Sequence, residues 1–385
     1  MKTKYARIYD FLAIALITIG LFWLIALRFS VHAQQPASAP IATGTFHLEN
    51  GKLEPRPVAG SLGETVNRWA ANSTKAEWLG YSVGEVNGDR SVCCGNWNGK
   101  DSQPCGTCRL EGQNHGTNIS THDGDGKKVS LEGPNELAVL YRAESGKITQ
   151  IRMFSIECTV DAGGLNVIWL QGVKASDSVG LLEEFVHGTD MDSAKHEEIG
   201  QSALSAIALH ADPSAVRAME SFVAASEPAS LRRETAFWLG EARGTEGLRI
   251  LQKIAQDDPS IAVRDQVTFA LSVSKEPGAL PEMIRMAHDD KSSQVRGQAL
   301  FWLGQKAGEK AAKAITGSIE NDPDTDVKKK AVFALSQMPP DEGVPKLIQV
   351  AQTNRNPQIR KEAMFWLGQS EDPQALAFFE KVLSQ

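Results

Sequence analysis

Apolar residues in the second half of the chain recur at helical spacing, and the whole pattern then repeats along the sequence. The segment Leu-Arg-Arg-Glu-Thr-Ala-Phe-Trp-Leu-Gly begins at Leu231, and related segments begin at Val263, Val295, Val327 and Ile359. Each start lies 32 residues after the previous one. A constant period of this length is typical of proteins built from stacked repeats, so it outweighs local secondary-structure propensity.

Each copy of the pattern predicts two amphipathic helices. The first helix buries positions four residues apart, such as Thr235 and Leu239, and the second carries Leu248 and Ile254 on one face. A small residue follows the last of these positions in each first helix, where we expect the helix to end: Gly240, Ser272, Gly304, Ser336 and Gly368. A weaker copy starts at Ile199, so we predict an α-solenoid of six two-helix repeats, the first acting as a cap.

Charged residues keep the same period. A basic residue stands near the start of each strong copy: Arg232, Arg264, Arg296, Lys328 and Arg360. Six residues before each of the last four stands a residue with a carboxylate or amide: Asp258, Asp290, Asp322 and Asn354. We expect a ladder of exposed acid–base pairs that sets the register between repeats, each pair worth under about 1 kcal/mol. A charged strip for binding a partner is the alternative interpretation.

Aromatic residues alternate with small ones from repeat to repeat. Phenylalanine is constant at five equivalent positions: Phe237, Phe269, Phe301, Phe333 and Phe365. The next position alternates between tryptophan and alanine: Trp238, Ala270, Trp302, Ala334 and Trp366. The unit of duplication is therefore two repeats, and large beside small side chains predict close packing between layers. An aromatic surface for a ligand is the alternative.

This pattern resembles HEAT repeats. The motif Val/Leu-Arg-x-x-Ala-x-x-x-Leu-Gly, the Asp-rich turn and the Leu-rich second helix are similar to the short class also found in phycobilisome lyases, over residues of about 199–385. The resemblance implies a scaffold that binds other proteins and says little about activity. Metal-dependent hydroxylases of this family carry repeated His-Glu pairs, whereas the repeats here contain none and a single pair, His196-Glu197, precedes them.

Charge argues against nucleic acid as a partner. From Lys195 onward the chain carries 23 Lys and Arg against 26 Asp and Glu, whereas nucleic-acid-binding relatives need a basic surface. The whole chain of 385 residues has a net charge of −7 and 42% hydrophobic residues, which indicates folded, soluble domains.

The N-terminus has the features of an export signal. Lys2, Lys4 and Arg7 precede an uncharged apolar run over residues 11–27, and Val31-His32-Ala33 resembles a signal-peptidase site. We therefore predict a signal peptide over residues 1–33, or a retained membrane anchor at residues 11–27. Either would place the rest of the protein outside the cytoplasm, in the periplasm, outside the cell or anchored to the inner membrane.

The remaining chain divides into a linker and two domains. Residues 34–43 are a linker rich in Pro, Ala and Ser, residues 44–190 an α+β domain that contains the cysteines, and residues 191–385 the solenoid. Alternating hydrophobicity within the α+β domain predicts the following elements: a strand at 78–83, a hairpin of 137–142 with 147–154, a strand at 165–173 and a short helix at 179–187. This domain resembles no family that we can name.

The cysteines are the candidate chemical site. Five are present: Cys93, Cys94, Cys105, Cys108 and Cys158. Structural disulfides suit an exported, loop-rich domain and are the preferred interpretation. Two alternatives remain. One is a zinc site made of Cys93 or Cys94, Cys105 and Cys108 with His115, His122 or Cys158 as the fourth ligand. The other is a redox-active Cys105-Gly-Thr-Cys108.

These features together predict a non-enzymatic scaffold without cofactor or bound metal, which binds a protein or peptide partner. If the second helices line the inner surface of the solenoid, the candidate contacts are basic residues on those helices: Arg249, Lys253, Arg285, Lys313 and Lys346. The alternative function is a redox or zinc-dependent protein centred on Cys105 and Cys108, with the solenoid as a docking arm.

Overall fold

A computed structural model describes residues 46–86, 90–93, 108–111, 118–121, 135–189, 197–306 and 308–384. All of these residues belong to one compact unit. The predicted export signal and linker lie outside the described residues, as do Cys94 and Cys105. None of the described helices is both long and apolar enough to cross a membrane.

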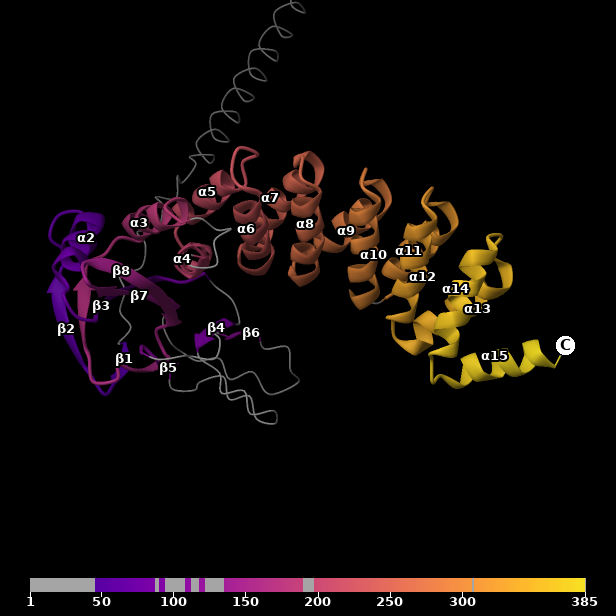
Figure 1. Ribbon diagram of the computed structural model, residues 1–385, viewed down its shortest axis with the longest axis horizontal. Helices are drawn as coiled ribbons and strands as arrows, with labels where there is room; N and C mark the ends of the chain where they lie inside the picture. Colours follow the sequence, from indigo (N-terminus) through magenta and orange to yellow (C-terminus); the bar gives the residue numbers. More distant parts are fainter. Residues whose placement is uncertain are drawn as a thin grey trace, which may run out of the picture. The chain divides into compact units, whose positions relative to one another are not determined.

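The N-terminal region is built around a five-stranded mixed sheet (Figure 1). Its strands lie in the order β2 (Lys52–Pro57), β10 (Asn166–Gln171), β3 (Glu77–Gly84), β7 (Glu136–Glu144) and β8 (Lys147–Ser155). Strand β10 pairs in parallel with β2 and β3, whereas β3, β7 and β8 pair antiparallel. The predicted strand at 78–83 and the hairpin are confirmed.

Both faces of this sheet are buried, so alternate residues of one strand enter different cores. Leu79 and Tyr81 of β3 pack with helices α2 (Leu62–Asn72) and α3 (Ala175–His187). Trp78 of the same strand packs on the opposite face. That face is covered by a small sheet of β1 (His47–Glu49), β9 (Thr159–Asp161) and β5 (Cys108–Arg109), while β4 (Arg90–Cys93) pairs with β6 (Asn118–Thr121). Helix α2 and the short strands were not predicted.

Twelve helices follow among the described residues, and they form the six predicted pairs (Figure 1). The first helices of the pairs are α4 (Glu197–Leu209), α6 (Ala229–Ala242), α8 (Ile261–Val273), α10 (Ser293–Lys306), α12 (Thr325–Ser336) and α14 (Pro357–Gly368). The second helices are α5 (Pro213–Phe222), α7 (Gly244–Asp257), α9 (Ala279–Asp289), α11 (Glu309–Asn321), α13 (Pro340–Thr353) and α15 (Pro373–Leu383). The protein is thus an α-solenoid that follows an α+β region.

The prediction that the small residue ends each first helix was wrong for Gly240 and Gly304. Helices α6 and α10 continue past both glycines. A Cβ atom on Gly304 would lie 2.6 Å from the carbonyl oxygen of Ala334 in the next first helix, and one on Gly240 would overlap the carbonyl oxygen of Ala270. These glycines therefore serve helix–helix contact, because any side chain would separate neighbouring repeats.

The sheet and the first repeat share one core. The Val86 N–H donates to the Leu209 carbonyl at 2.8 Å, and the Ala211 N–H donates to the Gly84 carbonyl at 2.8 Å. The end of β3 is thereby paired with the turn that joins α4 to α5. A continuous set of buried side chains runs from Leu62 through this junction to Phe378. The stack of repeats is therefore built directly onto the N-terminal sheet.

Candidate functional site

The charged residues that repeat along the sequence form a buried ladder. Arg264 donates from Nε to Asp290 Oδ2 at 2.8 Å and from Nη2 to Asp290 Oδ1 at 3.1 Å. Its Nη1 donates to the Asp258 carbonyl at 2.8 Å. The side chains of Arg264 and Asp290 are only 1% and 4% exposed. The same bidentate pairing joins Arg232 to Asp258, and Arg296 to Asp322.

The prediction of exposed pairs was therefore wrong. Each arginine pairs with the acid 26 residues ahead, at the end of its own repeat. Each also binds a carbonyl of the preceding turn, which lies six residues behind Arg264 and Arg296 and five residues behind Arg232. The acid also accepts a backbone hydrogen bond, as Asp258 does from the Ser260 N–H at 2.8 Å. Because both charges are buried and bidentate, removing one partner is expected to cost about 3–5 kcal/mol. The ladder fixes the position of each repeat.

One position of the ladder differs, and both partners differ together. Lys328 stands where the other repeats have arginine, and Asn354 stands where they have aspartate. The Lys328 Nζ donates instead to the Glu320 carbonyl at 2.9 Å. Arg360 still donates to the Asn354 carbonyl at 2.8 Å, so the contact between successive repeats is kept without the ion pair.

Aromatic rings form a continuous row across the first helices α6, α8, α10, α12 and α14. We call this row the aromatic strip, defined as Phe237, Phe269, Phe301, Trp302, Phe333, Phe365 and Trp366. Ring centroids in successive repeats lie 4.8–6.2 Å apart, as between Phe269 and Trp302 at 4.9 Å and between Phe301 and Phe333 at 6.2 Å. The rings of the strip are half-buried, and Phe365 is 54% exposed. The alternating tryptophans thus pack between repeats, while the strip retains exposed aromatic surface.

Charges of both signs border the aromatic strip. Burial raises the pKa of Asp265, and the hydrogen bond to Gln294 and the charges of Lys330 and Arg233 act in the opposite direction. A Cβ atom on Gly297 would overlap the Lys330 side chain, so this lysine lies flat across helix α10. The surface formed by the first helices therefore carries aromatic rings together with charged side chains of both signs.

The basic residues predicted on the second helices are present on the surface but are partly neutralised. Arg249 forms ion pairs with Glu246 at 3.1 Å and Glu220 at 3.5 Å, and Arg285 pairs with Glu282 at 2.5 Å. The other three have no ion pair within 4 Å to any described side chain: Lys253, Lys313 and Lys346. Their role in binding a partner stays a prediction.

The cysteines enter the structure in different ways. Cys158 is disulfide-bonded. Cys108 is fully buried beside Leu110 and Val160 in the small core under the main sheet. Cys93 is the last residue of β4. Disulfides as the role of Cys93, Cys94 and Cys105 stay a prediction, and Cys94 and Cys105 lie outside the described residues.

The redox alternative stays a prediction, because Cys105 lies outside the described residues. Within the described ranges, no three His, Cys, Asp or Glu side chains are grouped so as to hold a metal ion. The proposed zinc ligands Cys105, His115 and His122 lie outside those ranges, so the zinc alternative is not tested.

A buried polar chain that was not predicted joins the sheet to the first repeat. Tyr141 and Tyr81 share a hydrogen bond of 2.8 Å, Tyr81 contacts Ser178 at 2.7 Å, and Ser178 contacts His210 Nε2 at 2.8 Å. His210 Nδ1 lies 2.6 Å from the Ala206 carbonyl, so it carries the proton and Nε2 accepts. Burial lowers the pKa of His210 to about 4. Both ring nitrogens of this neutral histidine have hydrogen-bond partners, so His210 connects the sheet to the first repeat and has a structural role.

Comparison with known proteins identifies the helical region. Residues 216–304 and 312–385 match the family model for HEAT repeats, within the region where the sequence resembles such repeats. No curated protein sequence matches the chain.

Several solved structures are similar to part of this chain. The complex of CpcE and CpcF of phycocyanin lyase from Nostoc sp. PCC7120 is 20% identical, with 41% of this chain and 100% of that chain covered and a TM-score of 0.31. YibA of Escherichia coli is 19% identical, with coverages of 56% and 82% and a TM-score of 0.35. Human deoxyhypusine hydroxylase in complex with glycerol is 17% identical, with coverages of 54% and 90% and a TM-score of 0.26.

Proposed function

We propose that this chain, whose C-terminal half consists of HEAT repeats, is a non-enzymatic scaffold that binds a protein or peptide partner along the aromatic strip. The observation that carries the proposal is the row of half-buried rings on five neighbouring helices, with centroids 4.8–6.2 Å apart between repeats. Aromatic side chains are enriched at protein interfaces because they bury much apolar area while losing little conformational entropy.

The buried ladder supports the same function. Arg232, Arg264 and Arg296 each fix a first helix to the preceding turn and to the end of its own repeat. The helices that carry the rings are thus held in position before a partner arrives. A surface that is already ordered loses less entropy on binding, which favours affinity.

Site-specific photocrosslinking tests the proposal and distinguishes the two candidate faces. A benzoylphenylalanine placed at Phe269 or Phe333 lies on the aromatic strip, whereas one at Lys253 or Lys313 lies on the second helices. Irradiation of cells that express the full chain is expected to give a discrete adduct from the first two positions and none from the second two. Adducts from Lys253 and Lys313 alone would show that the partner binds the second helices and not the aromatic strip. No adduct from any of the four would contradict the scaffold function.

We also propose that the protein works outside the cytoplasm. The apolar run at residues 11–27 and the possible cleavage site at Ala33 support this location. The disulfide at Cys158 also supports it, because disulfides persist in oxidising compartments. The intact mass of the chain recovered from the cell envelope is expected to lack residues 1–33, or to be full-length in the membrane fraction. Recovery of the full-length chain with reduced cysteines from the cytoplasm would contradict export.

A further inference from the structure

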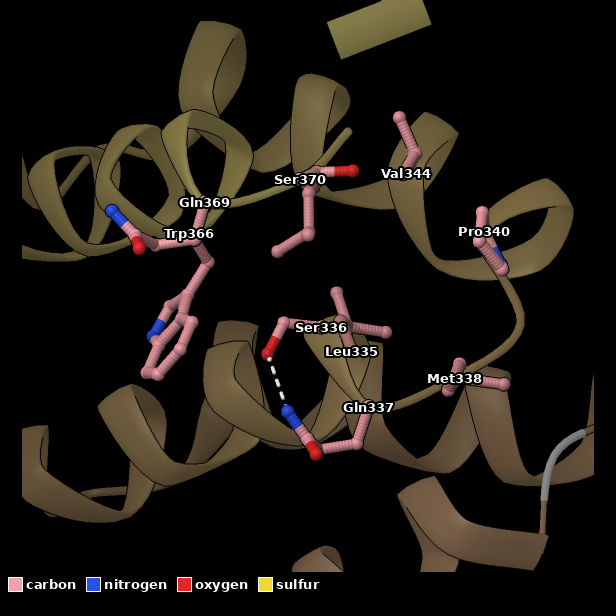
Figure 2. A pocket seen from close by; sticks show the side chains of 10 residues that line it. Leu335, Ser336, Gln337, Met338, Pro340, Val344, Trp366, Gln369 and Ser370 are labelled. Carbon is pink, nitrogen blue, oxygen red and sulfur yellow. Dashed lines mark hydrogen bonds between the residues drawn. The ribbon is translucent and has the colours of Figure 1, made fainter. Parts of the chain in front are cut away.

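A pocket of about 180 Å³ lies between the fifth and sixth repeats (Figure 2). The ends of α12 and α14 and the first turns of α13 form its walls. In Figure 2, Trp366 and Gln369 lie on one side of the opening, and Pro340 and Val344 lie on the other. The Trp366 ring also belongs to the aromatic strip and packs 4.8 Å from Phe333, so the pocket adjoins the strip.

The pocket has an apolar interior and an uncharged rim. Leu335, Val344 and Leu347 are 0%, 4% and 1% exposed and form the interior. None of the ten lining residues is charged. At the rim, Gln337 Nε2 donates to Ser336 Oγ at 3.2 Å, and the Ser336 hydroxyl donates to the Phe333 carbonyl at 2.7 Å. The Gln337 amide oxygen is therefore left to accept a hydrogen bond from a ligand.

The size of the pocket restricts what it holds. Cavities of about 150 Å³ accept a benzene ring, whereas pockets for drug-sized ligands or cofactors measure about 300–1,000 Å³. A volume of about 180 Å³ therefore suits one aromatic side chain. A charged group would lose hydration without finding a counter-ion among the lining residues, which excludes Lys, Arg, Asp and Glu side chains.

We propose that this pocket is an anchor site for a single uncharged aromatic side chain, phenylalanine or tyrosine, of the peptide that binds the aromatic strip. The inference rests on the proposed scaffold function and specifies the chemistry of the partner. The ring enters between Leu335 and Val344, and the Gln337 and Gln369 amides at the rim bind the peptide backbone. Aromatic residues held in small apolar pockets are typical hot spots of protein interfaces.

The duplicated sequence supplies substitutions that fill the pocket with compatible side chains. The positions 64 residues earlier carry a larger residue at one lining site and a charged residue at another: Leu280 for Val344 and Lys306 for Ser370. Val344→Leu therefore adds one methylene to the interior with a residue that the equivalent repeat already accommodates. Ser370→Lys adds a charge at the rim without changing the core. Val350→Met makes the same kind of exchange, since Met286 is its equivalent, at a buried site of α13 outside the pocket.

The test is a titration followed by fluorine NMR of the full chain labelled with 5-fluorotryptophan. The eight tryptophans give eight signals, and the variants Trp366→Phe and Trp302→Phe assign the signals of Trp366 and Trp302. N-acetyl-L-phenylalaninamide is expected to shift the Trp366 signal in a saturable way and to leave the Trp302 signal unchanged. N-acetyl-L-lysinamide is expected to shift neither.

The variants decide whether the ring enters the pocket. Val344→Leu and Ser370→Lys are each expected to weaken binding of N-acetyl-L-phenylalaninamide at least tenfold, and Val350→Met to leave it within twofold. A Trp366 signal that does not respond, that responds equally in the pocket variants, or that responds to the lysinamide overturns the inference. Because these probes need no partner, a negative titration beside a persistent crosslink from Phe333 refutes the anchor site and leaves the scaffold standing.

Discussion

Replacement of one buried Arg–Asp ion pair by the Lys–Asn combination that the chain itself uses tests the ladder. Lys328 and Asn354 stand where the other repeats place arginine and aspartate, and helix α12 is still held. The perturbation is Asp290→Asn alone, Arg264→Lys alone, and both together. In the double variant the lysine can reach the Gln256 carbonyl, which is equivalent to the Glu320 carbonyl that Lys328 binds.

The expected magnitudes follow from burial. Asp290→Asn leaves the Arg264 guanidinium, 1% exposed, without a counter-ion, so we expect the free energy of unfolding to fall by about 3–5 kcal/mol. Arg264→Lys removes the bidentate geometry, whereas Asp290 keeps its hydrogen bond from the Ser292 N–H at 2.8 Å, so we expect a loss of about 2 kcal/mol. The double variant removes the buried carboxylate, and its lysine ammonium binds a backbone carbonyl in the way that Lys328 does. We expect it to be more stable than the sum of the single changes predicts by about 1–3 kcal/mol.

Equilibrium urea unfolding followed by far-ultraviolet circular dichroism measures these differences, and hydrogen exchange locates them. Because repeats unfold partly independently, amides of α8 and α9 are expected to lose protection first in the single variants. A surface pair, Arg249→Lys with Glu246→Gln, is the control and is expected to cost under about 1 kcal/mol. Additive losses in the double variant, or losses equal to those of the surface control, would refute the ladder as a buried, coupled element.

Two further predictions test close packing and the buried histidine. Gly240→Ala and Gly304→Ala are each expected to lower the free energy of unfolding by about 1–3 kcal/mol, because the added methyl group meets the next helix. Gly368→Ala is the neutral control in the same urea assay, because the nearest atom to its added Cβ is 3.9 Å away. The pKa of His210 is about 4 in the folded protein and 6.5 in the unfolded chain. The stabilisation from neutral His210 is therefore complete above pH 6.5 and is lost as the pH falls towards 4. The total loss in the free energy of unfolding is about 3 kcal/mol. Urea unfolding between pH 7 and 4 measures this loss, which His210→Asn is expected to abolish; an equal decline in both proteins would contradict it.

The sequence predicted the repeat stack well because its information is periodic. Equivalent positions such as Val263 and Val295 recur so regularly that the helix pairs follow from spacing alone. The same regularity does not show how deeply a side chain is buried. A basic residue and an acid repeat every 32 residues whether their pair is exposed or buried, so the spacing could not show that Arg264 and Asp290 are enclosed. Gly240 and Gly304 were misassigned for a related reason, because contact between helices is not visible in one helix.

Long-range contacts in the N-terminal region were outside the reach of the sequence. Tyr81, Tyr141, Ser178 and His210 come together only because the sheet places β3 beside β7 and the first repeat against both. No spacing connects residues so far apart in the chain. The pocket between the fifth and sixth repeats was missed for a different reason, since its lining comes from three helices and none of the lining residues forms a motif.

Comparison of positions 64 residues apart separates residues that hold the fold from residues that distinguish one surface. Where two such copies agree, as at Phe269 and Phe333 or at Trp302 and Trp366, the shared packing between repeats explains the identity. The last two repeats depart from that pattern in the ladder, at Lys328 and Asn354, and in the pocket, at Gln337, Val344 and Ser370. The ladder difference keeps the contact to the next repeat, so it leaves the scaffold intact. The pocket differences change the side chains that a ligand would meet, and they therefore support the proposed anchor site between helices α12, α13 and α14.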